Sequence, residues 1–162
     1  DVMSGVEHLE RMGIVDTTRM GAMGWSQGGY ISAFLATNTT RFKALAAMMG
    51  LYNLKAFHGT TEELWFPEWE HGGPYYANPQ AYEKHNPENF VDRWKTPMMV
   101  IHGELDYRVP VTQGIAAFTA LQRRGIASRF LYFPDENHWV LKPENSIQWH
   151  NEVSRWLHAY LD

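Results

Sequence analysis

Apolar residues along this chain follow two alternating patterns. In four short segments they succeed one another almost without interruption, which is typical of strands buried on both faces of a sheet. These segments are Arg19–Trp25, Phe42–Met49, Pro97–His102 and Ser128–Phe133. Between and around them, apolar residues recur every three or four positions, which predicts amphipathic helices. The predicted helices are Asp1–Asp16, Gly28–Thr37, Val111–Gln122 and Glu144–Leu161.

Buried strands that alternate with helices indicate a parallel sheet. We therefore expect an α/β fold with about four parallel strands flanked by helices, with the strands side by side in sequence order. The segment Asn53–Phe90 fits neither pattern and is rich in glycine, proline and aromatic residues. Because a segment of this length without strands is usually functional, we expect it to form short helices that pack as a cap near a site.

The composition narrows the classes of function. Of the 162 residues, 44% are apolar and 14% aromatic, which is enough for the core of one domain. The net charge is -4 and the pI about 6.1, so we expect no surface for nucleic acid. No apolar run approaches the roughly 18 residues that a membrane span needs, so we expect no membrane partner.

Cysteine is absent, which excludes a disulfide framework and thiolate metal sites. The histidines show no spacing such as H-E-x-x-H, so we expect neither a metal nor another cofactor. The sequence begins at Asp1 and has no signal-peptide pattern. We expect it to be part of a longer chain, with any targeting signal upstream, which leaves the compartment open.

The stretch Gly24-Trp25-Ser26-Gln27-Gly28 joins a predicted strand to a predicted helix. It fits G-x-S-x-G, in which a sharp strand-to-helix turn exposes a nucleophilic serine and the glycines prevent clashes around the turn. The helix N-terminus points at such a site, so the backbone N–H of Gln27 is placed to receive a developing oxyanion. The pentapeptide also occurs as an ordinary turn, and its position between strand and helix favours the catalytic interpretation.

A serine hydroxyl needs an adjacent base. Hydrolases with this elbow supply an acid and then a histidine later in the chain. Asp106 follows the third predicted strand, and His138 follows the fourth. Because the carboxyl ends of parallel strands meet at the edge of the sheet where ligands bind, we expect Ser26, Asp106 and His138 to come together.

Other side chains near these positions have competing interpretations. Glu104 is an alternative acid, and His102 is more typical of a packed histidine than of a base. Asp135 and Glu136 stand too close in sequence to the proposed base to orient it, so we expect turn or surface charges. Trp139 is expected to pack on the histidine loop.

Three blocks of the sequence together resemble the prolyl oligopeptidase family of serine peptidases, with dipeptidyl-peptidase V-like and acylaminoacyl-peptidase-like members as the nearest match. The blocks read GWSQGGY, TPMMVIHGELDYRVP and FPDENHWVLKPENS, and the likeness covers nearly the whole chain. The resemblance implies an α/β-hydrolase fold with Ser26 as nucleophile, Asp106 as acid and His138 as base. It also implies that Tyr52 and Val109 line the pocket for the residue before the scissile bond.

The resemblance further implies that this chain is only the C-terminal half of the hydrolase domain. The β-propeller of the family, the first half of the sheet and the second oxyanion donor, usually a tyrosine hydroxyl, then lie outside it. The edge of Arg19–Trp25 would be bare and apolar, and such edges pair with other strands. We therefore expect self-association or association with the missing N-terminal part.

The implied function is hydrolysis of short peptides through an acyl-enzyme on Ser26, of the dipeptidyl- or acylaminoacyl-peptidase type. A peptide is the expected partner. Because the three catalytic groups do not distinguish amides from esters, a carboxylesterase on the same scaffold is an alternative. A catalytically incomplete fragment that acts only in an assembly is another.

Overall fold

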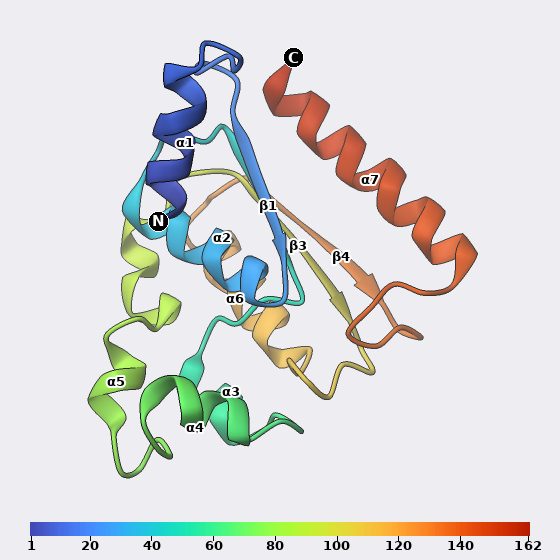
Figure 1. Ribbon diagram of the computed structural model, residues 1–162. Coiled ribbons are helices and arrows are strands. Elements are labelled where there is room, and N and C mark those ends of the chain that lie inside the picture. The colour runs from blue at the N-terminus through green and yellow to red at the C-terminus, as the bar shows by residue number, and fades with distance from the viewer.

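A computed structural model describes all 162 residues and contains one parallel sheet (Figure 1). Its strands follow the order β1-β2-β3-β4, as the apolar pattern predicts. They are β1 (Gly21–Trp25), β2 (Ala44–Met48), β3 (Met98–Gly103) and β4 (Ser128–Phe133). Because the strands run in the same direction, all four carboxyl ends lie at the same end of the sheet.

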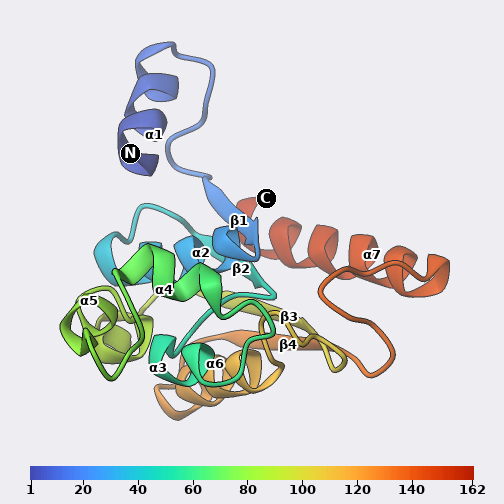
Figure 2. The ribbon, with the colours of Figure 1, turned by 60° about the horizontal axis from the view of Figure 1, so that its bottom comes forward.

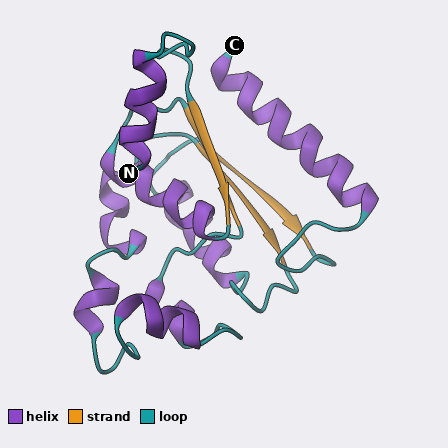
Figure 3. Cartoon of the chain, in the orientation of Figure 1, coloured by secondary structure: helices purple, strands orange, loops and turns teal.

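Helices cover both faces of the sheet, and the expected α/β fold with flanked parallel strands is confirmed (Figure 3). On one face α2 packs on β1 and β2, and α6 packs on β3 and β4, while α7 covers the other face. The bounds of these helices and of the first helix are α1 (Val2–Arg11), α2 (Gln27–Asn38), α6 (Thr112–Arg123) and α7 (Pro143–Leu161).

Two apolar clusters explain why the central strands lack polar alternation. Successive side chains of a strand point to opposite faces, and every residue of β2 and β3 is buried. Leu45 and Met98 face the cluster under α2 and α6, whereas Ala46 and Met99 face the cluster under α7. A strand with helices on both sides therefore has to be apolar at every position.

The segment between β2 and β3 forms short helices, as expected (Figure 2). Leu51, Leu54, Phe57, Tyr82 and Val109 form a third apolar cluster that fixes this segment against the loop after β3. The helices are α3 (Leu54–His58), α4 (Trp65–His71), α5 (Pro79–Glu83) and the 3-10 helix η1 (Pro87–Arg93).

The edge of the sheet at β1 has no neighbouring strand. Met23 and Trp25 on this strand keep 43% and 42% of their surface exposed. The strand begins at Gly21, two residues later than expected. Arg19 stands before it in a turn, where its side chain pairs with Asp16. The structure therefore contains the bare apolar edge that the sequence predicts.

Candidate active site

Ser26 occupies a sharp turn between β1 and α2, with φ 59° and ψ -116°. A positive φ is strained for a residue with a side chain and costs about 1–3 kcal/mol. Surrounding contacts hold this turn in place: the Ser26 N–H donates to the carbonyl of Met48 at the end of β2, at 2.8 Å.

The two glycines of the motif have different roles. A Cβ on Gly24 would lie 2.3 Å from the carbonyl oxygen of Gly28, so only glycine fits there. A Cβ on Gly28 would meet nothing within 4 Å. The expectation that both glycines prevent clashes therefore holds for Gly24 and is wrong for Gly28.

The three residues singled out from the sequence lie in one hydrogen-bonded chain. The Nε2 atom of His138 is 2.9 Å from Ser26 Oγ, and its Nδ1 atom is 2.7 Å from Asp106 Oδ2. A carboxylate only accepts, so Nδ1 carries the proton and Nε2 is free to accept one from the serine hydroxyl. His138 and Asp106 are each 2% exposed. This arrangement meets the geometric requirement for a serine activated by a histidine.

Asp106 reaches His138, and the alternative Glu104 does not. Glu104 is exposed and accepts a hydrogen bond from the Tyr132 hydroxyl. Asp106 Oδ1 accepts from the backbone N–H groups of Arg108 and Val109, at 3.0 and 2.8 Å, which leaves Oδ2 for the histidine.

The charged form of Asp106 is stabilised despite its burial. Burial raises the pKa of this carboxyl, but contacts from His102, His138 and the Val109 N–H outweigh it and hold the pKa below its ordinary value. A carboxylate that stays ionised is the group needed to stabilise an imidazolium during catalysis.

The loop that carries His138 is organised by Glu136, for which the sequence predicts a turn or surface charge but which is buried in the structure. Glu136 is 3% exposed, and its carboxylate accepts from the N–H groups of Leu141 and Lys142 and from the Asn145 side chain. Its own carbonyl accepts from the Leu105 N–H at 2.9 Å. Glu136 thus joins the histidine loop to the loop that carries the acid.

Two tryptophans pack on the histidine. The Trp25 indole N–H donates to the His138 carbonyl at 2.8 Å, and the two ring centroids lie 4.9 Å apart. The Trp139 ring meets the His138 ring edge-on at 5.2 Å, as expected for a residue that packs on this loop. The imidazole is therefore fixed by aromatic contacts as well as by its polar partners.

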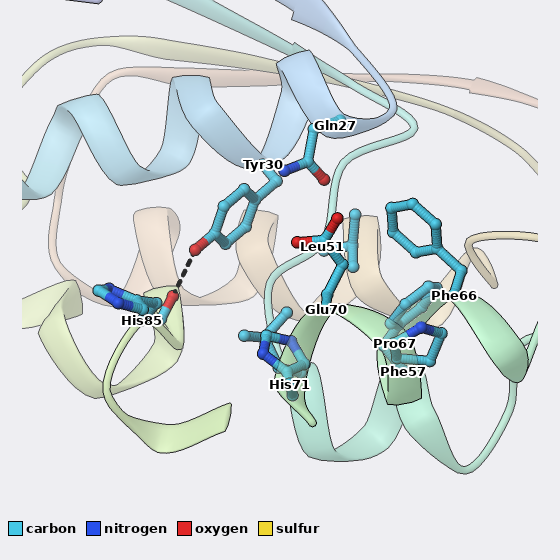
Figure 4. Close-up of a pocket in the computed structure, with 10 residues that line it drawn as sticks. Gln27, Tyr30, Leu51, Phe57, Phe66, Pro67, Glu70, His71 and His85 are labelled. Carbon is cyan, nitrogen blue, oxygen red and sulfur yellow. Dashed lines mark hydrogen bonds between the residues drawn. The ribbon is translucent and has the colours of Figure 1, made fainter. Parts of the chain in front are cut away.

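A cavity of about 170 Å³ opens beside Ser26. Figure 4 shows the lining of a second cavity of about 160 Å³. The two cavities share Gln27, Leu51, Phe57 and Phe66. The cap between β2 and β3 supplies the shared aromatic side chains. The first cavity is lined by Trp25, Ser26, Gln27, Leu51, Phe57, Glu63, Phe66, Arg108, Val109 and His138.

The two residues expected to line the pocket differ in position. Val109 lines the cavity beside Ser26. Tyr52 points into the core, where its ring meets Trp94 at 5.9 Å, and it lines neither cavity. Leu51, one residue earlier, takes the lining position.

Gln27 is the first residue of α2, directly after the serine. N–H groups in the first turn of a helix have no partner within that helix. Because Gln27 also lines the cavity beside Ser26, an N–H without a helical partner belongs to this site, where the helix dipole favours negative charge.

No group of three or more histidine, aspartate or glutamate side chains is arranged to hold a metal ion. The structure also contains no helix with the length and apolar character of a membrane span.

The sequence of this chain is similar to part of two dipeptidyl peptidases. Dipeptidyl-peptidase 5 of Schizosaccharomyces pombe is 43% identical, and that of Porphyromonas gingivalis is 40% identical, each over 99% of this chain. In both cases the match covers 24% of the relative, so the chain spans about a quarter of the length of these relatives.

Solved structures share the fold. Acylaminoacyl peptidase of Pyrococcus horikoshii matches 99% of this chain and 27% of its own, with a TM-score of 0.93 and 22% identity. The sequence profile of the prolyl oligopeptidase family matches residues 1–162. With relatives at 40% and 43% identity and a profile match over its whole length, the chain belongs to the prolyl oligopeptidase family.

Proposed function

We propose that this chain carries the catalytic triad of a serine peptidase that hydrolyses short peptides. The observation that carries the proposal is the buried chain Ser26–His138–Asp106, with distances of 2.9 and 2.7 Å. Three loops, each at the carboxyl end of a different strand, bring these groups together. A cavity also opens beside Ser26.

The geometry supports a two-step reaction. His138 Nε2 takes the proton from Ser26 as the serine oxygen attacks the peptide carbonyl, and Asp106 stabilises the imidazolium that forms. The Gln27 N–H donates to the oxyanion. The imidazolium then protonates the leaving amine, and a water activated by the same histidine hydrolyses the acyl-enzyme.

The cavity favours an apolar residue on the acyl side of the scissile bond. Leu51, Phe57, Phe66 and Val109 supply apolar walls, and the volume of about 170 Å³ suits a small to medium side chain. The relatives are named dipeptidyl-peptidase 5, and structural neighbours are acylaminoacyl peptidases. We place the substrate of this chain in the same class of short peptides.

We also propose that these residues form the C-terminal part of a larger catalytic domain. Two observations support this: the chain spans about a quarter of its relatives, and the β1 edge is apolar and unpaired. Further strands of the same protein, or a second copy of the chain, would satisfy the free N–H and C=O groups of β1.

The proposal is tested by steady-state kinetics on the full-length protein. We expect measurable kcat/KM on dipeptidyl amides with an apolar second residue, and its loss in Ser26→Ala. Ser4→Ala, at an exposed position on α1, is the matched control and should behave like the parent. Comparable amide hydrolysis by the parent and Ser26→Ala would reject the proposal, and turnover of short acyl esters alone would favour an esterase.

A further inference from the structure

A second histidine, His102, lies beside the same Asp106 oxygen that contacts His138. His102 is on β3 and is fully buried. Its Nε2 atom is 2.7 Å from the carbonyl oxygen of Val109 and 3.5 Å from Asp106 Oδ2. The triad mechanism does not use this side chain, although it touches two of the groups that define the site.

The surroundings of His102 select one tautomer. A carbonyl oxygen only accepts, so Nε2 carries a proton and donates it to Val109. The Nδ1 atom is buried and has no hydrogen-bond partner. It faces Gly114 on α6, where a Cβ would lie only 2.6 Å from it. The ring is therefore confined, with its N–H directed at the acid loop and a bare nitrogen against the helix.

The contacts of His102 converge on the turn from Asp106 to Val109. Val109 donates its N–H to Asp106 Oδ1 at 2.8 Å and accepts from His102 through its carbonyl. Val109 therefore connects His102 to Asp106 through its backbone. The two side chains also meet directly, with His102 Nε2 3.5 Å from Asp106 Oδ2. The side chain of Val109 also lines the cavity beside Ser26.

We propose that His102 is a positioning residue that holds Asp106 and the Asp106–Val109 turn in the orientation His138 requires. The inference rests on the proposed peptidase function. His102 touches neither Ser26 nor the cavity, so it acts through Asp106. Without the N–H of His102, the buried Val109 carbonyl would have no hydrogen-bond donor, and the turn would shift until the carbonyl found another donor. The carboxylate would move with it.

Two substitutions separate the N–H from the volume of the ring. His102→Gln places an amide NH₂ near the position of Nε2 and keeps a donor, whereas His102→Met fills the space without one. Ile101→Val, on the same strand but in the cluster under α7, is the control for a general disturbance of β3. All three are made in the full-length protein and assayed for kcat, KM and the pH dependence of kcat/KM. Circular dichroism spectra identify any variant that fails to fold.

We expect His102→Met to lower kcat by about 10- to 100-fold, as displacement of a catalytic group by up to an ångström does, with KM changed much less. His102→Gln should recover most of the loss, and Ile101→Val should match the parent. The acid limb of kcat/KM, which reports protonation of His138, should move to lower pH in His102→Met, because a displaced carboxylate stabilises the imidazolium less.

Three results would overturn the inference. The first is an equal loss of kcat in His102→Gln and His102→Met. The second is an acid limb of the kcat/KM profile that does not move in His102→Met, and the third is an acid limb that moves to higher pH in this variant. The last would mean that His102 competes with His138 for the carboxylate. If His102→Met fails to fold, the inference depends on His102→Gln, which must keep its kcat within a few-fold of the parent. A parent protein without peptidase activity would instead refute the proposed function, so the two failures are distinct.

Discussion

Gly24 and Gly28, on either side of Ser26, should respond very differently to the same substitution. In Gly24→Ala, the new Cβ would lie 2.3, 2.4 and 2.6 Å from the O, C and Cα atoms of Gly28. Ordinary Cβ contacts begin at 3.4 Å, so β1 and the start of α2 would have to separate by about 1 Å. All three contacts are backbone atoms, which cannot rotate away as a side chain would.

The expected losses of stability and of catalytic rate follow from the position of Ser26 between these two glycines. Overpacking of this kind costs about 1–3 kcal/mol of stability. Ser26 sits on the displaced turn, and a shift of 1 Å would stretch its 2.9 Å contact with His138 beyond hydrogen-bond distance. A misplacement of that size costs about 100-fold in rate. Gly28→Ala meets nothing within 4 Å and should keep both stability and rate.

The assay compares kcat/KM on a dipeptidyl amide and the urea midpoint for both variants and the parent. We expect Gly24→Ala to lose about two orders of magnitude in kcat/KM and to unfold at lower urea. Equal activity in Gly24→Ala and Gly28→Ala would refute the reasoning, since the two differ only in the space around the added methyl group.

Three further predictions concern Asp106, the loop that carries His138 and the edge of the sheet at β1. Asp106→Asn should lower kcat by roughly 10³- to 10⁴-fold, because an amide holds the histidine in the wrong tautomer; Glu104→Gln, which removes the rejected acid, should leave kcat unchanged. Glu136→Gln should lower the free energy of unfolding at pH 7 by about 1–3 kcal/mol. Hydrogen bonds lower the pKa of Glu136 in the fold against the opposing effect of burial, so this stabilisation is present above the ordinary glutamate pKa and lost as pH falls through the folded value; a difference from Glu136→Gln that grows toward acid pH would contradict this. Met23→Lys on the β1 edge should shift the isolated 162-residue chain toward monomer in sedimentation, and an unchanged association state would exclude pairing through that edge.

The two central strands could be predicted from the sequence because every position of β2 and β3 is buried, and apolar runs such as Pro97–His102 mark them. The outer strands β1 and β4 keep exposed positions, and sequence order was enough to place them in the sheet. The proximity of Ser26, Asp106 and His138 could be predicted for a different reason: parallel strands bring their carboxyl ends to the same end of the sheet. The distances between them depend on packing, which only the structure gives.

Three contacts near the site depend on how the chain folds and are not encoded in sequence spacing. Tyr52 and Leu51 are adjacent, so a single step along the chain decides which of them faces the cavity. Glu136 is buried because the loop after it folds back and presents N–H groups to its carboxylate. The contact between His102 and the acid loop requires the close approach of Gly114, which no local pattern signals.

The most direct test of the account is covalent labelling with a fluorophosphonate, which reacts with an activated serine. The full-length protein is labelled, digested and mapped by mass spectrometry, beside Ser26→Ala and His138→Ala. The account predicts one labelled peptide that contains Ser26, no label in Ser26→Ala and much slower labelling in His138→Ala. A label on another serine, or labelling of Ser26 at an unchanged rate in His138→Ala, would contradict it.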